Sequence, residues 1–177
     1  VAVAHHINDY IRAYEIKGIQ QFRRDYEVCV IMGLNVVGDL SEDGERGEAQ
    51  TFLAAIHGQQ QQAQSLNRRI WPVVKSPYGP QTAAIRVGRS SDNDMVIPEY
   101  SISHIHCQFS VREDNRLQIM DLDSHNGTLV NGERLRRGQV LLLEDQDELV
   151  LGRYLFEFLS ARTFVERVRR MASMRVA

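Results

Sequence analysis

The chain has 177 residues, 43% of them hydrophobic and 25% charged, with a formal net charge of −2, which is ordinary for a soluble globular protein of one or two small domains. Residues 76–160 carry 8 Lys/Arg against 13 Asp/Glu, so broad binding to nucleic acid is not expected. Cys29 and Cys107 form neither a disulfide framework nor a Cys-x-x-Cys motif, so we expect a reducing, cytoplasmic setting. No apolar run is long enough for a membrane-spanning helix, so we expect no stable membrane insertion.

Residues 1–69 are predicted to form an α-helical hairpin. Apolar side chains recur every three or four residues from Ile7 to Met32, a pattern typical of one face of a long helix. A turn signal at residues 38–41 precedes a second apolar series, which predicts a helix over about 41–69. Two such helices cannot cover both of their apolar faces by themselves. We therefore expect residues 1–69 to dock or to dimerise, with a homodimer as the favoured hypothesis.

Residues 70–160 change in character to short β-rich runs separated by turn residues. Side chains alternate between apolar and polar from Leu117 to Leu122, which indicates a strand with one face toward a core. Many such runs with no helical pattern between them are typical of a β-sandwich or barrel. The expected strands cover residues 83–88, 94–97, 106–112, 117–122, 128–130, 141–143, 148–151 and 154–159.

Residues 161–177 are predicted to form a short, basic, amphipathic helix. Thr163 and Glu166 have the spacing of a capping box, and the apolar side chains from Phe164 to Met171 share one face between arginines. The favoured interpretation is that this face docks on the rest of the protein. The alternative is a helix that visits an acidic surface or membrane.

Four short motifs in the β-rich segment are weak singly but specific in their order and spacing. They are Gly88-Arg89-Ser90, Ser103-His104-Ile105-His106, Ser124-His125-Asn126-Gly127-Thr128 and Asn131-Gly132. The series resembles the forkhead-associated (FHA) domain, a family of phosphothreonine-binding modules, over about half of the chain. The resemblance implies an eleven-stranded β-sandwich with its binding loops at one end. It also implies a phosphothreonine-dependent interaction module in Ser/Thr kinase signalling, with a phosphothreonine-containing protein as partner.

The resemblance assigns phosphopeptide-binding roles to a set of loop residues. Arg89 and Ser103 are expected to bind the phosphate, and a guanidinium can do so with two parallel hydrogen bonds. His104 departs from the Arg, Lys or Asn that the family often has, so affinity is expected to rise as the pH falls toward about 6. Asn126 is expected to bind the peptide main chain, and His125 to contribute mainly through its backbone.

A second set of residues is expected to support the loops. Gly88, Gly127, Thr128 and Asn131 are interpreted as loop architecture. His106 matches a family histidine that braces the binding loops from beneath through hydrogen bonds, although direct contact with the ligand stays an alternative.

Two other classes of function are alternatives to this interpretation. A phosphate-independent scaffold, using the same sandwich and the helical hairpin, is the main alternative because of the His104 departure. An enzyme is not expected, because no nucleophile elbow is present and the histidines have better explanations. No cofactor and no metal are expected, since the adjacent pair His5-His6 has a poor spacing for chelation on a helix.

Overall fold

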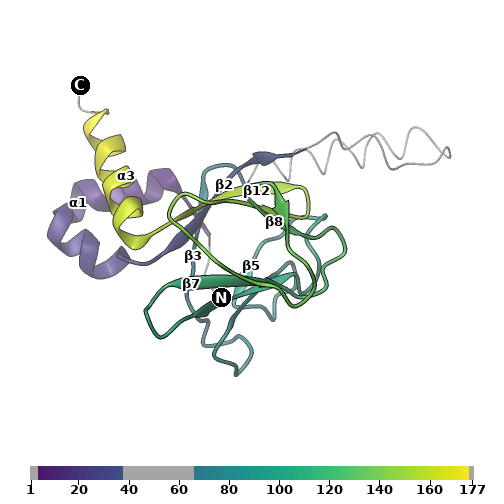
Figure 1. Cartoon of the computed structure of the whole chain (residues 1–177). Helices are drawn as coiled ribbons and strands as arrows, with labels where there is room; N and C mark the ends of the chain where they lie inside the picture. Colours follow the sequence, from purple (N-terminus) through teal and green to yellow (C-terminus); the bar gives the residue numbers. More distant parts are fainter. Residues whose placement is uncertain (1–3, 38–65, 176–177) are drawn as a thin grey trace, which may run out of the picture.

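The computed structural model describes residues 4–37 and 66–175, which form two facing sheets with two helices beside them (Figure 1). The larger sheet runs in the order β1 (His5–His6), β3 (Arg69–Pro72), β2 (Val30–Val36), β12 (Tyr154–Leu159), β11 (Glu148–Leu151), β8 (Thr128–Val130) and β9 (Glu133–Arg134). The smaller sheet runs in the order β10 (Val140–Leu142), β7 (Leu117–Asp121), β6 (Cys107–Val111), β4 (Ile85–Gly88) and β5 (Met95–Val96). The helices are α1 (Ile7–Tyr26) and α3 (Ala161–Ser173).

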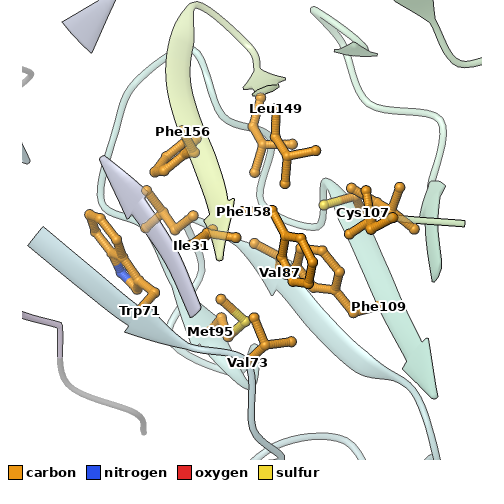
Figure 2. Packing of buried hydrophobic residues seen from close by; sticks show 14 of the residues in the cluster. Ile31, Trp71, Val73, Val87, Met95, Cys107, Phe109, Leu149, Phe156 and Phe158 are labelled. Carbon is orange, nitrogen blue, oxygen red and sulfur yellow. The ribbon is translucent and has the colours of Figure 1, made fainter. Parts of the chain in front are cut away.

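The space between the two sheets is filled by apolar side chains from both, as expected for a β-sandwich. Figure 2 shows Val87 and Phe109 of the smaller sheet meeting Ile31 and Phe158 of the larger one. Trp71 is also fully buried, and its indole Nε1 donates a hydrogen bond of 3.0 Å to the carbonyl oxygen of Val96. The β-sandwich prediction is therefore confirmed.

The strands expected within residues 83–159 lie where the sequence placed them, to within two residues at each end. The bounds 128–130, 148–151 and 154–159 are identical to those of β8, β11 and β12. The two-residue strand β9 was not predicted, because a run so short carries no periodicity.

The prediction of one helix from Ile7 to Met32 is wrong beyond Tyr26. The chain leaves the helix there and enters β2, which pairs with β12 on one side and β3 on the other. Ile31 faces the sandwich core, whereas Val30 and Met32 face the helices. A strand that is buried on both faces is apolar at every position, so its sequence does not differ from that of a buried helix.

The predicted helical hairpin therefore needs correction as a separate unit. Its first part supplies a strand to the sandwich, and residues 69 and 70 form part of β3 instead of the end of a helix. Most of the predicted second helix, residues 41–65, lies outside the described residues. Helix α1 itself is kinked at Gly18, whose φ of 70° and ψ of 166° are non-helical.

Helix α3 docks on α1 and on the outer face of the larger sheet. Phe164, Val165 and Val168 are fully buried there, in a second apolar cluster with residues of α1, β2 and β3. The Arg167 guanidinium pairs with both carboxylate oxygens of Glu157 on β12. This confirms the docking interpretation, and it contradicts a free amphipathic helix because the apolar face is covered.

The start of α3 differs from the expected capping box. Ser160 is the N-cap, and its hydroxyl accepts a hydrogen bond of 3.3 Å from the backbone N–H of Thr163. Thr163 lies in the first turn, and its own hydroxyl binds the carboxylate of Asp145. In the described parts of the chain, no helix is both long and apolar enough to cross a membrane.

Candidate functional site

Three of the four sequence motifs lie on loops at one end of the sandwich, because the strand register aligns the strand ends next to them. Val87 pairs with Cys107, and Cys107 pairs with Asp121, in the smaller sheet. In the larger sheet Thr128 pairs with Leu151. The turns at residues 89–94, 101–106 and 122–127 therefore meet, and we call them the recognition loops.

The first two recognition loops are joined through their backbones. The N–H of Arg89 donates to the carbonyl oxygen of Ser103 at 3.0 Å, and the N–H of Ser90 donates to that of His104 at 3.3 Å. The Arg89 side chain is exposed and has no hydrogen bond or ion pair with any other described residue. An arginine whose backbone is held by hydrogen bonds and whose guanidinium is exposed is suited to bind a dianionic ligand.

Asn93 fastens the same two loops from inside, and sequence reasoning gave it no role. Its side chain is buried, and its amide nitrogen donates to the carbonyl oxygens of Ser90 at 2.8 Å and His104 at 2.7 Å. Its amide oxygen accepts a hydrogen bond of 2.9 Å from Nε of Arg86. Only the fold shows which loops the Asn93 side chain joins.

The loops approach each other so closely at Gly88 that no side chain fits. A Cβ added there would lie 2.2 Å from the carbonyl oxygen of His104. The expected supporting role of Gly88 is thus explained by this close approach of two backbones.

Ser103 connects the second recognition loop to the third. Its hydroxyl oxygen accepts a hydrogen bond of 2.9 Å from the backbone N–H of His125, so the hydroxyl proton stays available for an anion. His104 and His125 are both exposed. Within residues 4–37 and 66–175, the hydrogen bond made by the Ser103 hydroxyl is to the backbone N–H of His125 and not to an imidazole.

His106 lies beneath the loops, fully buried, and joins two of them. Its Nδ1 accepts a hydrogen bond of 3.0 Å from the N–H of Ser103, so Nε2 carries the proton and donates to the carbonyl oxygen of Gly127 at 3.1 Å. Burial lowers the pKa of His106, which keeps the ring neutral. This geometry fits the bracing role expected from the family resemblance and leaves no ring nitrogen for a ligand.

A buried carboxylate orders the third recognition loop. Asp121 accepts hydrogen bonds from the N–H and hydroxyl of Ser124, at 3.0 and 2.6 Å, and from the hydroxyl of Thr128 at 2.6 Å. Burial alone would raise the pKa of Asp121, but these hydrogen bonds outweigh it and hold the pKa below its ordinary value. The carboxylate is therefore ionised at neutral pH. Thr128 acts in loop architecture, and Asp121 is a supporting residue that sequence reasoning missed.

The two asparagines of the motif differ in their surroundings. Asn126 donates one amide hydrogen to the carbonyl oxygen of Ser101 at 2.8 Å, and this bond fixes the orientation of its half-buried side chain. Asn131 has a φ of 50°, and its side chain binds Asp147 and the N–H of Glu148, at 2.7 and 2.9 Å. Asn131 therefore holds a turn far from the loops.

The candidate binding groups on the recognition loops are thus the Arg89 guanidinium, the Ser103 hydroxyl, the Asn126 amide and the imidazoles of His104 and His125, above a hydrogen-bonded base. Neighbouring segments supply no His, Cys, Asp and Glu cluster suited to a metal ion, as far as the described residues extend. Such an arrangement can bind an anion with an adjoining peptide group.

A family model and several known proteins match parts of the chain. Residues 85–152 match the model of the FHA domain family. The segment is similar to the ABC transporter ATP-binding/permease protein Rv1747 of Mycobacterium tuberculosis, with 42% identity over 69 residues, which are 39% of this chain and 8% of that protein. It is also 31% identical over 78 residues to the glycogen accumulation regulator GarA of the same species, covering 44% of this chain and 46% of the regulator.

Solved structures with a similar fold include the FHA domain of MEK1 in complex with a HOP1 phosphothreonine peptide. The match has 30% identity and a TM-score of 0.41, and covers 51% of this chain and 87% of that one. The chain spans less than half the length of the two curated relatives above.

Proposed function

Residues 85–152 are an FHA domain, and on this premise we propose that the chain binds phosphothreonine-containing proteins through its recognition loops and catalyses no reaction. The observation that carries the proposal is the exposed Arg89 guanidinium, which has no partner among the described residues, on a loop whose backbone is bonded to the carbonyl oxygen of Ser103. Charge-assisted bonds from a guanidinium favour a phosphate over a neutral group.

The surrounding residues have complementary roles in this proposal. Arg89 and Ser103 bind the phosphate, and His104 lies at the rim, where its imidazole adds a donor. Asn126 turns its amide oxygen and its second amide hydrogen toward the peptide main chain. His125 contributes through its backbone N–H, which orients Ser103.

The rigid base below the loops supports binding because the loops need little ordering when a ligand arrives. His106, Asn93 and Asp121 fix the three recognition loops before any ligand is present. Less conformational entropy is then lost on association.

Titration of a phosphothreonine peptide library against the purified chain tests the proposal. Phosphoserine and unphosphorylated libraries are the ligand controls. Loss of Arg89 removes about two charge-assisted hydrogen bonds of roughly 1.5–3 kcal/mol each, so Arg89→Ala should weaken binding about a hundredfold or more. Arg112→Ala is the matched control, because Arg112 is also exposed but lies at the opposite end of β6. Equal binding of the phosphorylated and unphosphorylated libraries would refute the proposal.

The alternative function is a phosphate-independent scaffold. It is favoured only by His104, which stands where the family often has Arg, Lys or Asn. Retained partner binding by Arg89→Ala, without phosphate dependence, would support it.

The wider setting is part of the same proposal. We place the chain in Ser/Thr kinase signalling in the cytoplasm, because a phosphothreonine mark requires such a kinase. A homodimer through residues 1–69 stays a prediction, although α3 now covers the described part of the apolar stripe that motivated it. Light scattering over a range of concentrations tests the dimer.

A further inference from the structure

The segment between β9 and β10 carries a dense group of arginines within an otherwise acidic domain. Residues 133–139 contain Arg134, Arg136 and Arg137 against the single acid Glu133. Together with Gly138 and Gln139 these residues line an open hollow of about 630 Å³. We call residues 133–139 the basic turn.

Strand pairing brings the basic turn to the end of the sandwich that holds the recognition loops. After the reversal at residues 131 and 132 the chain runs back, and the N–H of Leu135 donates to the carbonyl oxygen of Thr128 at 2.9 Å. The chain then enters β10, where Val140 pairs with Met120, the neighbour of Asp121. Both flanks of the basic turn thus lie next to the third recognition loop.

Two side chains of the basic turn reach that loop. A Cβ added to Gly127 would lie 2.4 Å from Cζ of Arg134, so this guanidinium lies against the backbone beside Asn126. The guanidinium of Arg137 lies 3.9 Å from the carboxylate of Asp123.

The positive charges of the basic turn are left largely unneutralised. Arg134 and Arg136 are exposed, and neither side chain has a hydrogen bond or ion pair with another residue in the described ranges. The ion pair of Arg137 is long, and its two side chains are 84% and 72% exposed. An exposed pair of this kind contributes little, so all three guanidinium groups can serve a ligand.

We propose that the basic turn is a second anion subsite, which binds an acidic side chain or a second phosphate of the same peptide whose phosphothreonine occupies the recognition loops. This inference rests on the proposed function and deepens it, because it names the class of ligand preferred. The hollow adjoins the Asn126 loop, so a peptide that contacts Asn126 passes the guanidinium of Arg134. The subsite selects ligands by charge at a position beside the phosphothreonine.

Affinities of three synthetic peptides that share one phosphothreonine test the subsite. The first has alanine flanks, the second has aspartates on both sides of the phosphothreonine, and the third carries a second phosphothreonine. The chain should bind the second or third peptide at least about fivefold more tightly than the first. The gain should shrink as the salt concentration rises, since exposed charges are screened.

Matched variants test whether the gain in affinity comes from the basic turn. Arg136→Gln with Arg137→Gln should bring the affinity ratio of acidic to alanine-flanked peptide close to one. Arg112→Gln with Arg116→Gln removes the same charge from the opposite end of the smaller sheet and should keep the ratio. The Arg134→Gln variant is measured separately, because its guanidinium contacts Gly127 and its loss can disturb the loop.

The outcomes separate this inference from the proposed function. A gain seen for both anionic peptides identifies a subsite for any anion, and a gain confined to the third identifies one for phosphate. The subsite is overturned if neither peptide gains, or if the gain survives in the Arg136→Gln, Arg137→Gln variant. If the alanine-flanked phosphopeptide binds no better than its unphosphorylated form, the proposed function itself fails.

Discussion

The amide nitrogen of Asn93 lies 2.7 Å from the carbonyl oxygen of His104, so a side chain buried next to β5 fixes the loop that carries Ser103. The same nitrogen bonds the carbonyl oxygen of Ser90 at 2.8 Å. The Asn93 side chain thus adds to the two backbone hydrogen bonds that join the two loops assigned to the phosphate by the proposed function.

Asn93→Ala should destabilise the fold and weaken phosphopeptide binding. The carbonyl oxygens of Ser90 and His104 each lose one of their two donors. At about 0.5–1.5 kcal/mol for each lost hydrogen bond, we expect a loss of roughly 1–3 kcal/mol in the free energy of unfolding. Urea denaturation measures it. Asn93→Asp should be no better, because a carboxylate offers no donor to either carbonyl. Asn35→Ala, at an exposed position on β2, should change stability by less than about 0.5 kcal/mol, and a similar loss there would contradict the explanation.

His106 should make stability depend on pH in the weakly acidic range. Its folded-state pKa is lowered by burial, whereas in the unfolded chain the ring titrates near the ordinary value of 6.5. Above that pH both states are neutral and the full stability is present. As the pH falls through it, the unfolded state binds the proton first, and stability declines.

Urea denaturation at several pH values between 7.5 and 5 checks this dependence. His106→Gln should be less stable at pH 7.5 and should lose part of the pH dependence above pH 5. An unchanged slope in the variant would assign the effect to other groups.

His104 should give the affinity for phosphopeptide a pH dependence of its own. A cationic imidazole binds phosphate more strongly than a neutral one, and the sequence hypothesis is that affinity rises as the pH falls. The ratio of wild-type affinity to that of His104→Gln should rise about threefold to tenfold from pH 8 to pH 6. The ratio cancels the titration of the phosphate itself. A constant ratio would show that His104 does not contact the phosphate.

Gly18→Ala should destabilise the protein, although the same change usually stabilises a helix. Gly18 has a φ of 70° with a ψ of 166°, a backbone region that residues with a Cβ rarely adopt, so the cost is about 1–3 kcal/mol. No neighbouring atom lies within 4 Å of an added Cβ, so the effect is one of backbone strain alone. Thermal unfolding measures it, with the exposed Gln20→Ala as control. A stabilised Gly18→Ala would mean that α1 is straight in solution.

The turns and strands of the β domain were predictable because their signals are local. Asn131 and Gly132 both adopt positive φ, of 50° and 82°, and asparagine and glycine tolerate that conformation best. The alternation on β7 follows from one buried face. Signals of this kind need no knowledge of distant residues.

The course of residues 28–36 could not be read from the sequence in the same way. Ile31 packs in the sandwich core while Val30 and Met32 pack under the helices, so the apolar run fits a helix or a buried strand equally well. Only pairing with β3 and β12 decides for the strand, and both partners are distant in the sequence.

By itself the sequence determined the β-sandwich and the motif positions of Arg89, Ser103 and His106, because turn chemistry and strand periodicity are properties of neighbouring residues. Only the tertiary structure decided how these positions are joined. Asn93, Asp121 and Arg134 owe their places to partners on other loops, and contacts between distant segments arise from strand register and packing, which no local pattern encodes.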